Sequence, residues 1–167
     1  MSDKFINKLV KSSVIQNILD WVNAKEAAIK AAELRKLNKD LNRTNLRKIS
    51  KFTDASNKTD RANCMIAICE GDSAANAVLS ARTEMIGCYP LKGKPINALG
   101  ASTKDMLANK EFVDLLQVCG LKIGERVESL DSIRFGKIAL LADSDPDGSH
   151  IVGLVCAMFK KFWPELS

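Results

Sequence analysis

The stretch KIALLADSDPDGSHI, residues 137–151, joins an apolar run to three aspartates at alternate positions. The apolar run predicts a short buried strand, and the residues from Gly148 onward predict a helix. Asp143, Asp145 and Asp147 therefore lie where a strand ends and a helix begins. Because like charges repel, three aspartates in five positions indicate that a cation binds among them.

Two other kinds of site share part of this pattern. A calcium-binding EF-hand loop needs a helix before it and a Glu at its twelfth position. Here a strand enters the loop, and the twelfth position counted from Asp143 is Leu154. Phosphatases with a nucleophilic Asp after a strand place Thr or Val after the second Asp, where this chain has Pro146. Capping of the following helix is the structural alternative for the aspartates.

A second strand, turn and helix occur earlier in the chain. CMIAIC, residues 64–69, predicts a buried strand, Gly71 permits a turn, and Asp72 or Ser73 caps the predicted helix. Glu70 ends this strand and joins the three aspartates if the two strands are neighbours in a parallel sheet. Such carboxylates suit Mg²⁺, which also binds phosphate oxygens, so we expect a phosphoester substrate. Without metal, repulsion is expected to raise the pKa of at least one of these acids.

The first third of the chain predicts one long basic helix or two joined helices. No Gly or Pro occurs from Ser13 to Lys48, and the residues through Arg61 hold fourteen Lys and Arg against seven Asp and Glu. Apolar residues recur at helical spacing in the first half of this helix: Val14, Ile15, Ile18, Leu19 and Val22. The excess of positive charge indicates either a polyanion partner or a solvated helix face. We expect a helical connector, residues 1–61, followed by an α/β domain, residues 62–167.

The remaining sequence predicts further elements of an α/β domain. Residues 51–63 predict a loop, residues 86–97 a brief strand and a loop with two lysines, and residues 104–119 a helix. Five cysteines without a C-x-x-C pair, and a single His, argue against zinc and for reduced thiols in the cytoplasm. No apolar stretch approaches the roughly 20 residues that span a membrane, and no signal peptide opens the chain, so we expect no membrane partner.

Three motifs together resemble the Toprim domain of type IIA DNA topoisomerases in order and spacing. They are EGDSA (70–74), PLKGK (90–94) with Asn97, and DSDPDGSHI (143–151). KFTDAS (51–56) resembles the segment before that domain, and the basic helix resembles the connector from the ATPase-transducer region. YPLKGKPINALG and FWPEL look most like the large subunit of T-even-type bacteriophage members. The resemblance implies an α/β, Rossmann-like Toprim fold with a mostly parallel sheet and helices on both faces, preceded by the long basic helix.

The resemblance also implies roles for the acidic residues. Glu70 matches a metal ligand that acts as general acid/base in strand cleavage and rejoining. Asp143, which shares this catalytic assignment, and Asp145 match the two aspartates that hold Mg²⁺. Asp147 matches the third metal-site aspartate, which acts directly or through water.

Four further positions match residues that contact DNA. Lys94 and Asn97 match contacts near the cleaved phosphodiester. Lys92 stands where Arg is more usual, and Lys keeps the charge without bidentate phosphate recognition. His150 matches a His that touches DNA or the metal-bound carboxylates, with a structural hydrogen bond as the alternative.

The implied function is cleavage and religation of duplex DNA by transesterification, with Mg²⁺ as cofactor and Mn²⁺ or Ca²⁺ as substitutes. The family's nucleophile is a Tyr on a winged-helix domain or subunit, and Tyr89, the single Tyr here, does not match its place. ATP is expected to bind a region outside this chain, so we expect the chain alone to be inactive. A stand-alone Toprim-type nuclease or primase module is the alternative. The expected location is the cytoplasm, that of the host if the protein is phage-encoded.

Overall fold

The computed structural model describes residues 13–43 and 49–166. The chain divides into two compact units, and the boundary in the sequence falls between Asp40 and Leu41. The basic segment contains α2 (Ser13–Arg43), one uninterrupted helix rather than the alternative of two joined helices. The predicted continuation to Lys48 lies outside the described residues. The apolar residues of α2 are largely exposed, Trp21 most of all at 62%. None of the helices described is long and apolar enough to cross a membrane.

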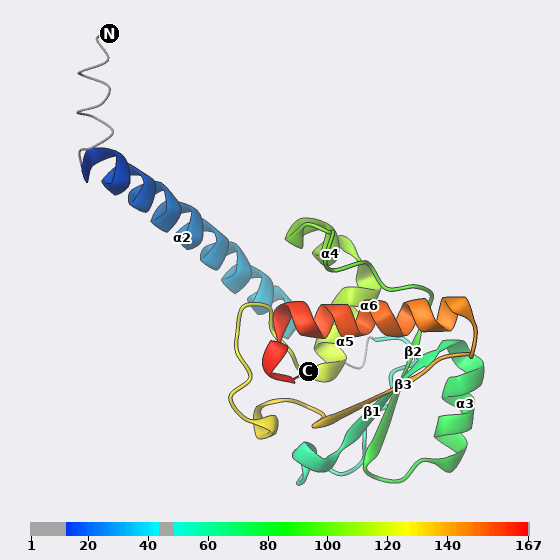
Figure 1. Ribbon diagram of the computed structural model, residues 1–167. Coiled ribbons are helices and arrows are strands. Elements are labelled where there is room, and N and C mark those ends of the chain that lie inside the picture. Colours follow the sequence, from blue (N-terminus) through cyan, green and yellow to red (C-terminus); the bar gives the residue numbers. More distant parts are fainter. Residues whose placement is uncertain (1–12, 44–48, 167) are drawn as a thin grey trace. The chain divides into compact units, whose positions relative to one another are not determined.

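The second unit holds a small sheet and the helices that cover it (Figure 1). Its elements in chain order are η2 (Arg61–Asn63), β1 (Met65–Glu70), α3 (Gly71–Ala81), β2 (Ile86–Leu91), α4 (Thr103–Ala108), α5 (Lys110–Cys119), η3 (Leu130–Ser132), β3 (Lys137–Leu141), α6 (Pro146–Phe162) and η4 (Pro164–Leu166). The predicted α/β class is therefore confirmed. Thr53, in the predicted loop before β1, forms a bridge to Cys88 of β2, so that loop packs on the sheet. That residues 1–61 act as a connector stays a prediction.

The three strands are parallel and lie in the order β2-β1-β3. Met65 of β1 pairs with Ile86 of β2 and with Lys137 of β3, which confirms that the two strands ending in acidic residues are neighbours. The chain passes from β1 to β2 on one side and then crosses to β3 on the other. The carboxyl ends of β1 and β3 therefore lie side by side at the place where the order of the strands reverses. Open α/β sheets bind ligands at such a place.

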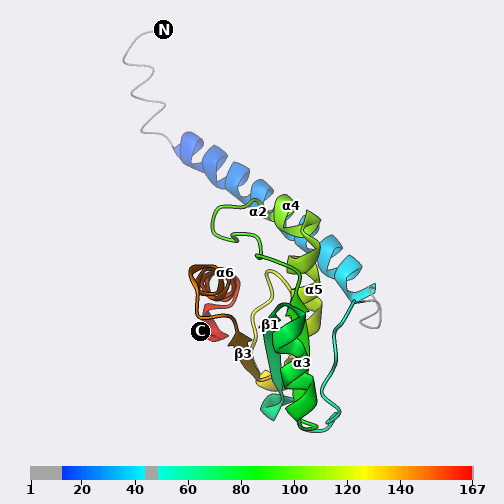
Figure 2. The ribbon, with the colours of Figure 1, turned by 90° about the vertical axis from the view of Figure 1, so that its right-hand side faces the viewer.

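Helices cover both faces of the sheet. Successive side chains of each strand point to opposite faces, so each strand packs against helices on both sides. Cys69, Cys88 and Leu141 pack with Ala75 of α3 on one face. On the other face Tyr89 donates a hydrogen bond to Glu111 of α5. Figure 2 shows the strands between α3 and α6.

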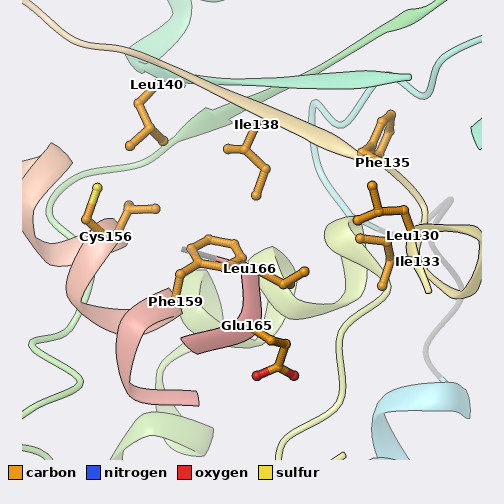
Figure 3. Close-up of a pocket in the computed structure, with 11 residues that line it drawn as sticks. Leu130, Ile133, Phe135, Ile138, Leu140, Cys156, Phe159, Glu165 and Leu166 are labelled. Atoms are coloured by element: carbon orange, nitrogen blue, oxygen red, sulfur yellow. The ribbon is translucent and has the colours of Figure 1, made fainter. Parts of the chain in front are cut away.

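The third strand is less buried than the sequence predicts. Lys137 and Ile138 are exposed, and the rest of β3 is half-buried. Among the residues described, β3 has β1 as its one strand partner, whereas β2, at the other edge, also pairs with Thr53 of the preceding loop. In Figure 3, Ile138 and Leu140 point from β3 into an apolar pocket of about 480 Å³, with Phe159 of α6 on its far side.

The helix predicted over residues 104–119 is divided in two at Asn109. The Asn109 backbone N–H donates to the carbonyl of Asp105 at the end of α4. Its side chain accepts from the N–H of Phe112 at 2.9 Å and so caps α5. Asn competes for backbone hydrogen bonds and favours caps, which explains the break that apolar periodicity alone does not reveal.

Candidate metal- and DNA-binding site

Glu70 and Asp143 meet at the carboxyl edge of the sheet. Because Cys69 pairs with Leu141, β1 and β3 deliver their next residues to the same level. The backbone N–H of Asp143 donates to Glu70 Oε2 across 3.0 Å. The structure therefore brings together these two predicted catalytic residues, and a backbone hydrogen bond orients the Glu70 carboxylate.

Gly148 allows the start of α6 to lie against this pair. A Cβ built at Gly148 would lie 2.2 Å from the Asp143 carbonyl oxygen and 3.0 Å from Glu70 Oε2, distances that an alanine could not occupy without displacing backbone. The helix begins at Pro146, two residues before the predicted start at Gly148, so Gly148 lies within its first turn. A glycine at the start of a predicted helix was the available signal, because glycine in a helix usually has a packing reason.

Asp145 caps α6. Its Oδ1 accepts from the N–H of Gly148 at 2.7 Å, and Pro146 follows at the first helical position. Asp145 therefore makes the helix-capping contact that was the structural alternative to metal binding. The predicted cap of α3 at Asp72 or Ser73 is wrong, because that helix already begins at Gly71, with Glu70 at the N-cap and no side-chain cap hydrogen bond.

Asp147 forms an ion pair with Lys94. Lys94 Nζ donates to Asp147 Oδ1 at 2.7 Å, and both side chains are substantially exposed. The hydrogen bond and charge of Lys94 hold the pKa of Asp147 below its ordinary value. Charge crowding predicts a raised pKa, and for Asp147 the shift is the opposite because Lys94 donates a hydrogen bond to it and places a positive charge beside it.

A pocket of about 450 Å³ gathers charged side chains at this edge of the sheet. It is lined by Lys51, Glu70, Gly71, Asp72, Leu91, Lys92, Gly93, Lys94, Asp147 and Ile151. Four residues predicted from the sequence are in this set: Glu70, Lys92, Lys94 and Asp147. The apolar pocket beside β3 has one charged lining residue, Glu165 (Figure 3), so the chemistry belongs to the charged pocket.

Two predicted DNA contacts lie outside this lining. Asn97 accepts from the N–H of Leu99 at 3.1 Å and thereby closes a turn after the Lys94 loop. His150 is exposed on the first turns of α6, close in sequence to Asp147. The structure does not bring either one into the pocket.

Three further residues, to which the sequence assigned no role in the site, shape this pocket: Lys51, Asp72 and Glu111. Lys51 pairs with Asp72, and both line the pocket. Glu111 of α5 accepts from the backbone N–H of Lys92 at 3.2 Å and from the Tyr89 hydroxyl at 3.1 Å, so it holds the start of the lysine loop. No local pattern marks these partners, since each pair joins distant parts of the chain.

Comparison with known proteins gives the context of this geometry. No family model matches the chain. Over 99% of its length the chain is 33% identical to DNA topoisomerase 2 of Arabidopsis thaliana and 35% identical to that of Plasmodium falciparum. The chain is homologous to a region of DNA topoisomerase 2. It covers 11% and 12% of these two relatives, respectively.

The topoisomerase 2 likeness extends to three dimensions. The crystal structure of the Plasmodium falciparum topoisomerase II DNA-binding, cleavage and re-ligation domain matches with a TM-score of 0.68 and 34% identity. The match covers 73% of this chain and 18% of that one. These relatives support the type II topoisomerase resemblance that the three motifs indicate.

The acidic residues at the strand ends of this topoisomerase 2 homologue are candidate ligands for a divalent cation. Within residues 13–43 and 49–166, no three His, Cys, Asp or Glu side chains form a ready-made cluster for a metal ion. The donor set is nevertheless of the kind that Mg²⁺ prefers, because it consists of carboxylate oxygens at strand ends. Asp145 and Asp147 are exposed, so their side chains can turn away from Gly148 and Lys94. The donor chemistry of these carboxylates therefore suits Mg²⁺.

Tyr89 is placed unlike a nucleophile. Its side chain is 2% exposed, and its hydroxyl donates to Glu111. Burial, together with the charges of Glu111 and Asp114, raises the pKa of Tyr89 above its ordinary value. A phenol that is buried and hard to ionise is poorly suited to attack a phosphodiester.

Proposed function

We propose that this chain is the Mg²⁺-binding Toprim portion of a type II DNA topoisomerase, which supports cleavage and religation of duplex DNA by transesterification. One observation carries the proposal: Glu70 and Asp143 are hydrogen-bonded at the carboxyl edge of the sheet, and Glu70 shares a pocket with Lys92 and Lys94. The similarity to DNA topoisomerase 2 supports the reaction class.

The acidic residues hold the metal and move the proton in this proposal. Mg²⁺, when bound, supplies charge stabilisation for the scissile phosphate and the leaving 3′-oxygen. Glu70, Asp143 and Asp145 are the ligands, and Asp147 joins them directly or through water. Glu70 also serves as general acid/base, because its carboxylate lies at the pocket wall with one oxygen oriented by Asp143.

The basic residues position the DNA backbone. Lys92 and Lys94 are exposed at the pocket and neutralise phosphates next to the cleaved bond. Asn97 and His150 are further DNA contacts in this proposal, outside the pocket lining. Because Lys94 reaches Asp147 directly, the lysines would hold a phosphate next to the one at the metal-binding acids.

Other parts of the enzyme complete the reaction. The nucleophilic Tyr comes from a winged-helix domain or subunit, and ATP binds the ATPase-transducer region; both are separate from the pocket described here. We further infer membership of the T-even-type bacteriophage branch, with a cytoplasmic location in the host, supported by YPLKGKPINALG (89–100) and FWPEL (162–166).

Thermal melting with and without Mg²⁺ tests the metal assignment. A ligand that binds the folded chain alone raises the melting temperature, so Mg²⁺ should stabilise the wild type. Asp143→Asn should abolish that response while leaving the backbone hydrogen bond to Glu70 available. Asp131→Asn, which changes an exposed acid in η3, is the matched control and should respond like the wild type. A full Mg²⁺ response in Asp143→Asn would refute the metal site.

A further inference from the structure

A lysine from outside the three motifs lines the same pocket. Lys51 lies in the loop before β1, and its ammonium pairs with Asp72 in the first turn of α3. The two side chains are 48% and 58% exposed. The pair has the same form as Lys94–Asp147, and Glu70 lines the pocket together with both pairs.

The backbone at Lys51 adopts a conformation that a lysine does not favour. Its φ is 64°, and among the residues described it is the one non-glycine with positive φ. Glycine adopts the left-handed region without steric cost, whereas a side chain with Cβ is strained there. Strained residues of this kind cluster at active sites and ligand-binding sites.

The loop that carries Lys51 is fixed to the domain on both sides. Ile49 is buried, and Thr53 exchanges two backbone hydrogen bonds with Cys88 of β2, at 2.9 and 2.8 Å. Asp54 accepts hydrogen bonds from Arg61 and from Arg134, the latter at 2.6 Å. These contacts hold Lys51 at the pocket on an ordered backbone.

We infer that Lys51 is a third phosphate-binding residue of this pocket and that its ammonium leaves Asp72 to bind the DNA backbone. An exposed Lys–Asp pair contributes little to stability, so the exchange of a carboxylate for a phosphate costs little. Lys51 adds a third positive charge to the pocket lining that Glu70 shares with Lys92 and Lys94. This inference rests on the proposed function, because it takes DNA as the ligand.

The test measures binding of a short fluorescein-labelled DNA duplex to residues 1–167 by anisotropy over a series of salt concentrations. Four variants are compared with the wild type: Lys51→Ala, Lys51→Gly, Lys51→Arg and Lys122→Ala. Lys122 is the matched control, because it is also an exposed lysine paired with a carboxylate, Glu125, and it lines a different pocket. Thermal melting of each variant reports the fold separately.

The expected result separates charge from backbone conformation. Lys51→Ala and Lys51→Gly should weaken binding alike and lower the slope of log affinity against log salt by about 0.9. Lys51→Gly should melt above Lys51→Ala, because glycine accepts the left-handed backbone. Lys51→Arg should retain the wild-type slope, and Lys122→Ala should bind like the wild type.

Four outcomes would overturn the inference. If Lys51→Gly binds DNA like the wild type while Lys51→Ala does not, the position matters only for its turn. If all Lys51 variants bind like the wild type, or if Lys122→Ala loses as much affinity, Lys51 makes no particular phosphate contact. If the wild type itself binds no duplex at low salt, the proposed DNA-binding function fails together with the inference.

Discussion

Lys94 Nζ and Asp147 Oδ1 lie 2.7 Å apart, although the two residues are 53 positions apart in the chain. Their ion pair joins the loop after β2 to the first turn of α6, across the pocket that holds Glu70. One partner is the proposed DNA contact and the other the proposed metal-site acid. Binding of DNA and metal would therefore separate the same pair, which couples the two events physically.

Replacement of Lys94 by Ala should raise the pKa of Asp147 towards its ordinary value. The hydrogen bond from Lys94 is the main cause of the lowered pKa, so its loss removes most of the shift. Because the folded-state pKa is lowered, the stabilisation from this pair is present above the unfolded pKa and lost as pH falls through the folded one. An NMR titration of the Asp147 carboxyl measures the shift.

Lys92→Ala is the control for that titration, because Lys92 lines the same pocket and its structural hydrogen bond comes from the backbone, to Glu111. It should leave the Asp147 titration where the wild type has it. An unchanged Asp147 titration in Lys94→Ala would show that the ion pair is absent in solution.

Gly148→Ala should destabilise the fold, whereas Gly153→Ala in the same helix should not. The added methyl at residue 148 meets the Asp143 carbonyl, and such overpacking costs about 1–3 kcal/mol. Gly153 is exposed with nothing within 4 Å of the added Cβ, so alanine should gain up to about 1 kcal/mol from helix propensity. Urea denaturation measures both free energies of unfolding. Equal effects at the two glycines would contradict the close packing of α6 on the site.

Asp54→Asn should remove an acid-sensitive part of the stability. Partial burial alone would raise the pKa of Asp54, but hydrogen bonds from Arg61 and Lys58 and the charge of Arg134 outweigh it and lower the pKa to about 2. The stabilisation is therefore complete above about pH 4 and is lost as pH falls towards 2. A shift of this size corresponds to roughly 2 kcal/mol at neutral pH.

Urea denaturation at pH 7 and at pH 2–4 checks this prediction. The wild type should lose unfolding free energy between about pH 4 and 2, and Asp54→Asn should begin lower and lose less. Asp60→Asn, which neutralises an exposed acid of the same loop, is the control and should keep the wild-type profile. A wild-type acid profile in Asp54→Asn would mean that the Arg61 and Arg134 contacts contribute nothing.

Residues 1–167 alone should neither nick nor relax supercoiled plasmid in the presence of Mg²⁺, since Tyr89 is buried and bound to Glu111. Tyr89→Phe should cost about 1 kcal/mol of stability through the lost hydrogen bond and leave DNA binding unchanged. Gel electrophoresis of the plasmid and anisotropy check the two statements. Mg²⁺-dependent nicking by the chain alone would instead favour the stand-alone nuclease.

Local sequence determined the elements that carry the site. Short apolar runs followed by Gly or Pro and acidic residues specify strands that end at Glu70 and just before Asp143, because strand and turn preferences depend on near neighbours. The adjacency of β1 and β3 followed from one assumption about a parallel sheet, and the structure confirmed it. The long helix α2 followed in the same way from the absence of Gly and Pro.

The tertiary structure alone decided which side chains meet. The ion pair of Lys94 with Asp147, the fixing of the Lys51 loop by Arg134 and the need for Gly148 each join segments that are distant in sequence. The exposure of β3 likewise depends on its place at the edge of the sheet. Local propensity carries no information about such contacts, because they form only when packing brings separate elements to one edge.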